Sequence, residues 1–162
     1  MEFKNLMFTN FSPEITTILI AMSPILELRG AIPTALGVYH LPLHIAYFWA
    51  VLGNIISAVF VLLLLEPVSK FLMKNFEICN RFFKKLFEKT RGKHNHRFEK
   101  WGALALVTFV AIPLPCTGSW TGAVAAFVFG IPFKKSFPLI SLGIMIAGII
   151  VSFASIGVFK II

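Results

Sequence analysis

Two residues able to carry charge, Glu27 and Arg29, lie in the middle of a long apolar stretch, residues 13–40. A charge at bilayer depth costs on the order of 3 kcal/mol, so such residues face a cavity or a partner. A carboxyl group there can exchange a proton or hold a cation, and Arg binds phosphate or carboxylate through its bidentate fork. The alternative is structural, with both groups forming a buried pair or reaching the membrane surface. We expect Glu27 to be the proton-coupling site and Arg29 an anion clamp.

Side chains two positions apart on a regular helix do not face each other. Glu27 and Arg29 can therefore serve one cavity only if the backbone beside them is unwound. Gly30 and Pro33 follow directly and permit such unwinding. We therefore include both among the residues expected to line a substrate site.

A second polar break interrupts the apolar stretch 101–131. The residues expected to line the site there are Pro113, Pro115, Thr117, Gly118, Ser119, Trp120, Thr121 and Gly122. The N–H groups of residues 119–122 would open a returning helix and favour an anion. The pair Gly118 and Gly122 also fits a close helix contact between small residues, and both interpretations can hold together.

The other polar residues suggest little further chemistry. Asn54 lies beside Gly53 in an uncharged stretch, where we expect it to bond another segment and line the site. His94 and His96 have no third metal ligand nearby, which favours a solvated loop. The sequence has no phosphate-binding loop, zinc-protease motif or Ser-His-Asp arrangement. We expect no enzyme activity, cofactor or metal site.

The composition indicates which solvent surrounds these residues. The 162 residues are 57% hydrophobic and only 14% charged, with a mean hydropathy of +0.85. Soluble domains carry roughly 25% charged residues. We expect one all-α integral membrane domain, residues 1–162, that crosses the cytoplasmic membrane more than once.

Four apolar regions organise the chain. Residues 42–65 and 136–160 are uncharged up to their ends and long enough to cross a bilayer, and Glu66-Pro67 marks the expected end of the first. Residues 13–40 and 101–131 are broken by proline and glycine, and we expect re-entrant hairpins there. Kinked full-length spans are the alternative for these two regions.

Charge sets the expected topology. Ten of the fifteen basic residues lie between Lys70 and Lys100, so residues 66–100 are expected in the cytoplasm. With two hairpins, both termini fall outside, and Lys134 and Lys135 fall inside. Twelve basic residues are then inside and two outside, with Arg29 in the membrane. A second full crossing at 101–131 would place Lys134 and Lys135 outside, against the rule.

An internal repeat supports two hairpins. An offset of 90 residues aligns the residues 41–43 with 131–133, and Gly53 with Gly143. Each unit is a hairpin followed by one span, so the two units have opposite orientations. Inverted repeats of this kind are common in secondary transporters, whose sites lie near the midplane at broken helices.

The segment 66–100 contains a basic amphipathic pattern. Its apolar face carries Leu72, Phe76, Cys79, Phe83 and Leu86. Its basic face, expected at the membrane surface, carries Lys70, Lys74, Arg81, Lys84 and Lys85. Anionic lipid is the expected partner of such a helix, rather than nucleic acid. A helical hairpin packing on itself in water is the alternative.

Two motifs resemble those of the small multi-drug export protein family, which is distantly similar to the DedA/VTT membrane proteins. They are ELRGAIP at 27–33 and PLPCTGSWTGA at 113–123. The resemblance implies paired re-entrant hairpins and, from the DedA relatives, movement of lipid phosphates or phospholipids with proton coupling. Glu27 matches an acidic position in their first hairpin. Cys116 replaces an expected glycine, and the arginines of the DedA second hairpin are missing from 101–131.

Three functions are compatible with these features. The first is a transporter or flippase for an amphipathic anion or lipid, coupled to protons through Glu27. The second is a drug/proton antiporter, for which Glu27 alone suffices and Arg29 is structural. The third is a membrane scaffold that does not transport. The small enclosed volume of four short elements favours a homodimer in each case.

Overall fold

The structure is a computed structural model that describes residues 11–75, 77, 96–113 and 118–161. Within these ranges the regular elements are all helices. They are α1 (Pro13–Met22), α2 (Glu27–Gly37), α3 (Leu43–Asn75), α5 (His96–Ala111), α6 (Ser119–Val128) and α7 (Phe133–Ile161). The expectation of an all-helical chain is therefore confirmed for the described residues.

The first hairpin consists of α1 and α2. Ser12 caps α1 by accepting a hydrogen bond from the Ile15 N–H (3.5 Å), and Pro13 stands in the first turn of the helix. Ser23 and Pro24 end the helix, because a proline disfavours helical backbone in the residue before it. α2 then returns along α1 and packs against it. Each arm is about 15 Å long at about 1.5 Å per residue, half of a bilayer core of about 30 Å.

The second hairpin consists of α5 and α6, which also pack against each other. α6 begins after Gly118 and ends at a turn in which Gly130 has φ 68°. Pro132 follows, and its carbonyl accepts hydrogen bonds from the Lys135 and Ser136 N–H groups at the start of α7. Each hairpin thus leads through a short turn into a long helix.

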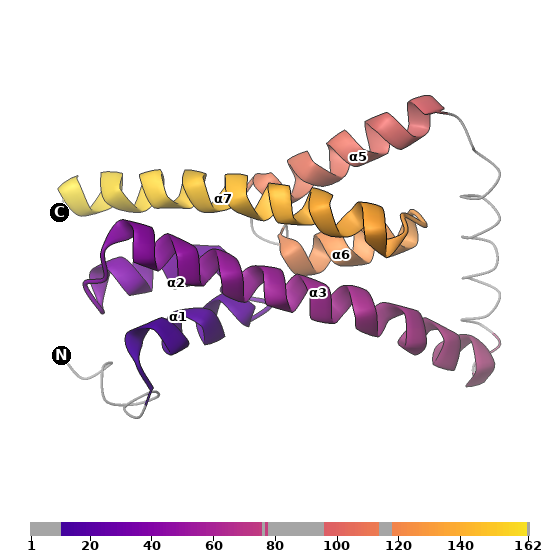
Figure 1. Cartoon of the computed structure of the whole chain (residues 1–162), viewed down its shortest axis with the longest axis horizontal. Coiled ribbons are helices and arrows are strands. Elements are labelled where there is room, and N and C mark those ends of the chain that lie inside the picture. The colour runs from indigo at the N-terminus through magenta and orange to yellow at the C-terminus, as the bar shows by residue number, and fades with distance from the viewer. Residues whose placement is uncertain (1–10, 76, 78–95, 114–117, 162) are drawn as a thin grey trace.

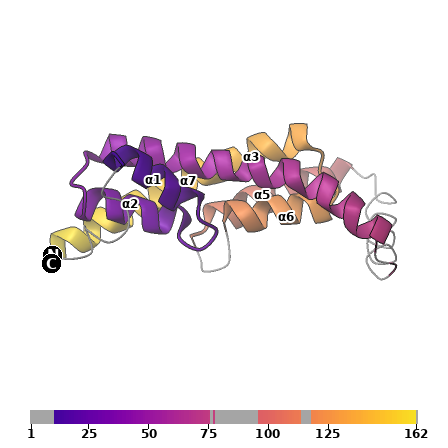
Figure 2. The same ribbon diagram turned by 90° about the horizontal axis from the view of Figure 1, so that it is seen from below.

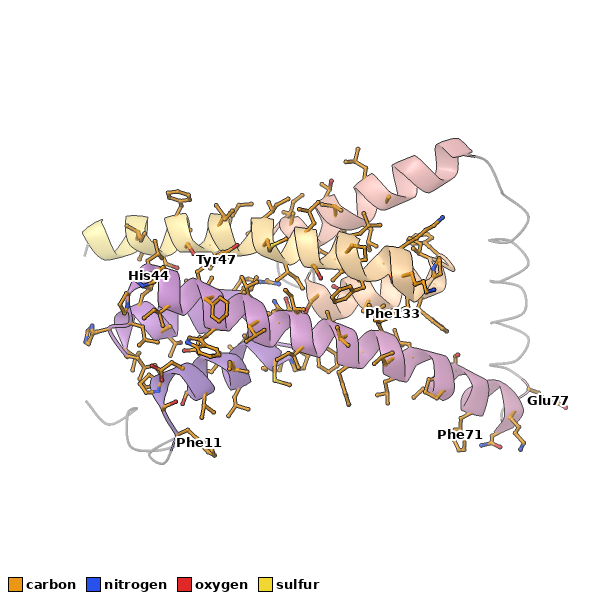
Figure 3. All side chains as sticks on the ribbon, in the orientation of Figure 1. Phe11, His44, Tyr47, Phe71, Glu77 and Phe133 are labelled. Carbon is orange, nitrogen blue, oxygen red and sulfur yellow. The ribbon has the colours of Figure 1, made fainter. Side chains whose placement is uncertain are left out.

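The long helices α3 and α7 run antiparallel along the molecule and contact each other (Figure 1). The α1–α2 hairpin lies along one half of the molecule's length and the α5–α6 hairpin along the other half. The ends of the two hairpins meet near the middle, as the turned view also shows (Figure 2). α1 begins and α7 ends at one end of the molecule, whereas α3 ends and α7 begins at the other. Figure 3 places Phe11 and His44 at the first end and Phe71 and Phe133 at the second.

α3 is longer than the sequence suggested. We expected it to end at Leu65 before Glu66-Pro67, but the helix continues through Pro67 to Asn75. An internal proline removes one helical hydrogen bond, and the helix continues beyond it although Val68 and Phe71 are exposed. Lys74 is exposed on the last turn of this helix, which also carries Lys70. The basic residues Arg81, Lys84 and Lys85 lie outside the described residues.

The predicted offset of 90 residues separates the starts of the two long helices. α3 begins at Leu43 and α7 at Phe133. A Cβ on Gly53 would lie 2.7 Å from the Ile18 carbonyl oxygen of α1. At the equivalent Gly143, a Cβ would lie 2.7 Å from the Val110 Cβ of α5. Each long helix therefore uses a glycine to let the first arm of its own hairpin approach closely.

Residue size is distributed in the pattern of a membrane protein. The buried contacts between helices are made largely by small side chains, including Ala21, Ala31 and Ala50, all fully buried. Large apolar side chains face outward, and Phe153 of α7 is 73% exposed. Helices pack through small residues where the surrounding lipid is as apolar as leucine. α3 and α7 are also each long and apolar enough to cross a bilayer, over Leu43–Ser69 and Phe133–Val158.

Candidate functional site

The carboxylate of Glu27, in the first hairpin, contacts the second hairpin. Glu27 is the first residue of α2, with φ 46°, a left-handed conformation that is uncommon for residues other than glycine. Its side chain is only 6% exposed. Oε1 accepts hydrogen bonds from the Ser119 hydroxyl (3.2 Å) and the Trp120 N–H (3.4 Å) at the start of α6. Strained backbone of this kind persists only where its surroundings hold it in place, and it is common at functional sites.

Gly118 makes this contact sterically feasible. A Cβ at position 118 would collide with Oε2 of Glu27 and lie 2.6 Å from its Cδ. The overlap could be relieved by a shift of the Glu27 carboxylate, which would disturb its hydrogen bonds to Ser119 and Trp120. The end of the second hairpin can therefore receive Glu27 only because residue 118 has no side chain.

Asn54 of α3 joins the same contact. The Ser119 Oγ atom also lies within hydrogen-bonding distance of the Asn54 Oδ1 atom, so the single hydroxyl hydrogen is shared between the Glu27 and Asn54 oxygens. Ser57, one turn further along α3, donates to the Asn54 carbonyl oxygen (3.0 Å). Asn54, Ser57 and Ser119 are each at most 2% exposed. One buried polar cluster thus joins α2, α3 and α6 where the hairpins meet.

Glu27 and Arg29 line the same small cavity. Asn54, Pro113, Gly118 and Ser119 also line it, and its volume of about 10 Å³ is room for about one water molecule. Arg29 interacts electrostatically with the Glu27 carboxylate. The structure therefore brings together the two charged residues and part of the second break.

The route by which these two side chains meet differs from the prediction. We expected unwound backbone at Gly30 and Pro33, but both lie inside the continuous helix α2 and neither lines the cavity. The irregular backbone comes earlier, at residues 23–26, and ends in the left-handed Glu27. Gly30 instead fits beneath Leu26, whose Cβ would lie 2.8 Å from an added Cβ. Its role in the structure is close packing.

The remaining predicted residues of the second break have different surroundings. The Thr121 hydroxyl donates to the Gly118 carbonyl oxygen (3.3 Å), and Gly122 packs against Val110 of α5. Neither lines the cavity. The Trp120 indole N–H is buried and has no hydrogen-bond partner among the described residues. Pro115 and Thr117 lie outside the described residues, as does Cys116.

Sequence reasoning missed several residues of the site. Ser57 belongs to the polar cluster, and its position one turn after Asn54 was a usable signal. The apolar cavity wall comes from α5 and α7 through Val110, Ile144, Ala147 and Val151. These residues resemble the other apolar residues of their helices, so nothing in the sequence alone marks them.

The carboxyl group of Glu27 occupies a place suited to anions. Unpaired N–H groups and the helix dipole favour an anion at the start of a helix. The sequence predicted such a site at residues 119–122, and the structure places the carboxylate of Glu27 there. The Glu27 side chain therefore occupies the position at which the sequence predicted an anion.

Comparison with known proteins gives one match. The profile of the small multi-drug export protein family matches residues 27–150, more than half of the chain. No characterised protein and no solved structure shows significant similarity. The matched region begins at Glu27 and includes the α2, α3 and α6 residues of the polar cluster. Together with the two long apolar helices, the match suggests a membrane protein.

Proposed function

Because the chain belongs to the small multi-drug export protein family, we propose that it moves an amphipathic anion across a membrane together with protons. The family name implies a transporter rather than an enzyme. The observation that carries the proposal is the buried carboxylate of Glu27 at the start of α6, beside Arg29. The resemblance to DedA proteins adds a lipid phosphate as the class of anion. The partners in this proposal are membrane lipid, an amphipathic substrate and protons.

In the membrane, the two hairpins would be re-entrant and the two units inverted. Arms of ten or eleven residues in α1, α2 and α6 are too short to cross a bilayer alone. Because the Glu27 carboxylate contacts the start of α6 where the two hairpins meet, Glu27 would then lie near the membrane centre. Irregular backbone at that depth requires burial in protein or a wet cavity, which the polar cluster supplies.

This arrangement predicts which residues are accessible from each side. Cysteines introduced at Ser12 and at Lys134 should be labelled from opposite faces of the cytoplasmic membrane, position 12 from outside and position 134 from inside. The reason is that α1 begins and α7 begins at opposite ends of the molecule. Labelling with a membrane-impermeant thiol reagent in whole cells and in inverted vesicles measures this, in a variant lacking Cys79 and Cys116. Labelling of both positions from one face would contradict re-entrant hairpins.

In this proposal, transport requires the substrate anion to replace the Glu27 carboxylate at the start of α6. While Glu27 is ionised, its carboxylate occupies the N–H groups of α6 and excludes another anion. A protonated Glu27 no longer requires those donors, and the substrate headgroup can take its place between α6 and Arg29. The cavity of about 10 Å³ has no room for a headgroup, so the hairpins must also separate. A second copy of the chain, as a homodimer, would help to shield the opened site from lipid.

Because the anion binds only when Glu27 is protonated, the proposal predicts the direction in which anion affinity changes with pH. Binding of an alkyl sulfonate, whose own charge does not titrate near neutrality, should strengthen as the pH falls. One proton taken up per anion bound changes the affinity by up to about tenfold per pH unit. Isothermal titration calorimetry in two buffers with different ionisation enthalpies measures both the affinity and the proton uptake. Anion binding without proton uptake would reject the mechanism.

The family match favours drug/proton antiport as a second candidate. In that mechanism a cationic drug competes with the proton for Glu27, so its binding at this site weakens as the pH falls and releases protons. The same calorimetric experiment therefore distinguishes the two by sign. A scaffold that does not transport would show neither effect.

A further inference from the structure

A second, larger hollow lies between α1 and α3, away from the polar cluster. It has a volume of about 610 Å³, within the range of roughly 300–1,000 Å³ typical of small-molecule sites. Its apolar wall is formed by Ile15, Ile18 and Ile45, and its aromatic rings come from Phe48 and Trp49. The hollow lies at the end of the molecule where α1 and α3 begin, the end marked by Phe11 and His44 in Figure 3.

The ionisable groups of the hollow lie on its two helices. Glu14 is in the first turn of α1 and His44 in the first turn of α3. Among the described residues, Glu14 is the only acidic one that lines the hollow, and no described lysine or arginine lines it. The Phe48 and Trp49 rings stand nearly perpendicular, 76° apart with centroids at 5.2 Å. A carboxylate beside aromatic faces attracts a positive charge, both directly and through cation–π interaction.

We propose that this hollow binds a hydrophobic monovalent organic cation. Its apolar groups pack against the isoleucines and Phe48, and its charge lies between the Glu14 carboxylate and the Trp49 ring. The volume admits a drug-sized molecule, whereas the cavity at Glu27 does not. The inference does not depend on anion transport, because it uses other residues at another place in the fold.

The test uses two ions of the same shape and opposite charge. Tetraphenylphosphonium and tetraphenylborate binding to the full-length protein in nanodiscs is measured by equilibrium dialysis. The cation should bind more tightly than the borate anion. Glu14→Gln should weaken cation binding about fivefold, the effect of one partly exposed charge pair. The matched control Glu77→Gln removes the same charge two residues past the far end of α3 and should change nothing.

Two further measurements keep the result interpretable. Glu14→Gln should retain or strengthen tetraphenylborate binding, which shows that the hollow is still formed. Trp49→Leu, which keeps apolar bulk but removes the ring, should weaken the cation more than the anion. Equal binding of both ions, insensitive to Glu14→Gln, would overturn the proposal and indicate a groove for lipid chains. A failure of the pH test at Glu27 would leave these outcomes unaffected.

Discussion

Replacing Gly118 with alanine should force the two hairpins apart and abolish transport. The added Cβ would collide with Oε2 of Glu27 and lie 2.6 Å from its Cδ, so the carboxylate must leave the start of α6. Overpacking of a buried site costs about 1–3 kcal/mol. Removing the hydrogen-bond donors of a buried carboxylate lowers the stability by a further amount of about 1–3 kcal/mol or more. Thermal unfolding in detergent, followed by size-exclusion chromatography, measures the loss of stability.

A second-site change makes this prediction specific. Glu27→Asp shortens the side chain by one methylene and should restore part of the stability of Gly118→Ala, because the carboxylate withdraws from the new methyl group. Gly102→Ala is the matched control, since nothing lies within 4 Å of a Cβ at that position. That control should be neutral or slightly stabilising. Normal stability and transport in Gly118→Ala alone would show that the Glu27 contact is dispensable.

Replacing Glu27 with glutamine should uncouple transport from protons without unfolding the chain. The amide has nearly the shape of the carboxyl group and can still accept from the Ser119 hydroxyl and the Trp120 N–H. It cannot ionise, so it no longer exchanges a proton for the substrate anion. Alkyl sulfonate binding should therefore persist in this variant, with no dependence on pH and no proton uptake in the calorimeter.

The control for this variant is Glu77→Gln, which removes a carboxylate far from the polar cluster. It should keep the wild-type pH dependence. If Glu27→Gln also kept that dependence, the proton would have to bind elsewhere and Glu27 would be a structural partner of Arg29. If the variant failed to fold, Glu27→Asp would serve instead, because it retains a titratable group at a changed distance from α6.

Much of the arrangement could be predicted from sequence because proline, glycine and charge act locally. Pro24 and Pro113 follow the ends of α1 and α5, although Pro33 and Pro67 lie inside helices. An uncharged run of two dozen residues favours a helix that crosses the bilayer. The repeat at an offset of 90 residues places Leu43 and Phe133 at equivalent helix starts. Glu27 was a candidate because a carboxyl group in such a segment needs a partner.

The remainder depends on contacts between distant residues. That Glu27 lies against Ser119, 92 positions away, follows from the packing of two hairpins and not from any local pattern. The left-handed backbone of Glu27 could not be predicted from the sequence either. Glutamate rarely adopts that conformation unless its surroundings impose it. α3 also continues past Pro67 to Asn75, where the Glu66-Pro67 pair had suggested an end.

The most direct test of the account is transport in proteoliposomes under an imposed pH gradient. The protein is reconstituted with a fluorescent alkyl sulfonate outside, and the interior is made more alkaline than the exterior by about one pH unit. One proton carried inward with each anion supplies about 1.4 kcal/mol, so wild type should accumulate the anion up to about tenfold at zero membrane potential. Glu27→Gln should only equilibrate it. Accumulation that is the same with and without the gradient, or that survives Glu27→Gln, would contradict proton coupling through Glu27.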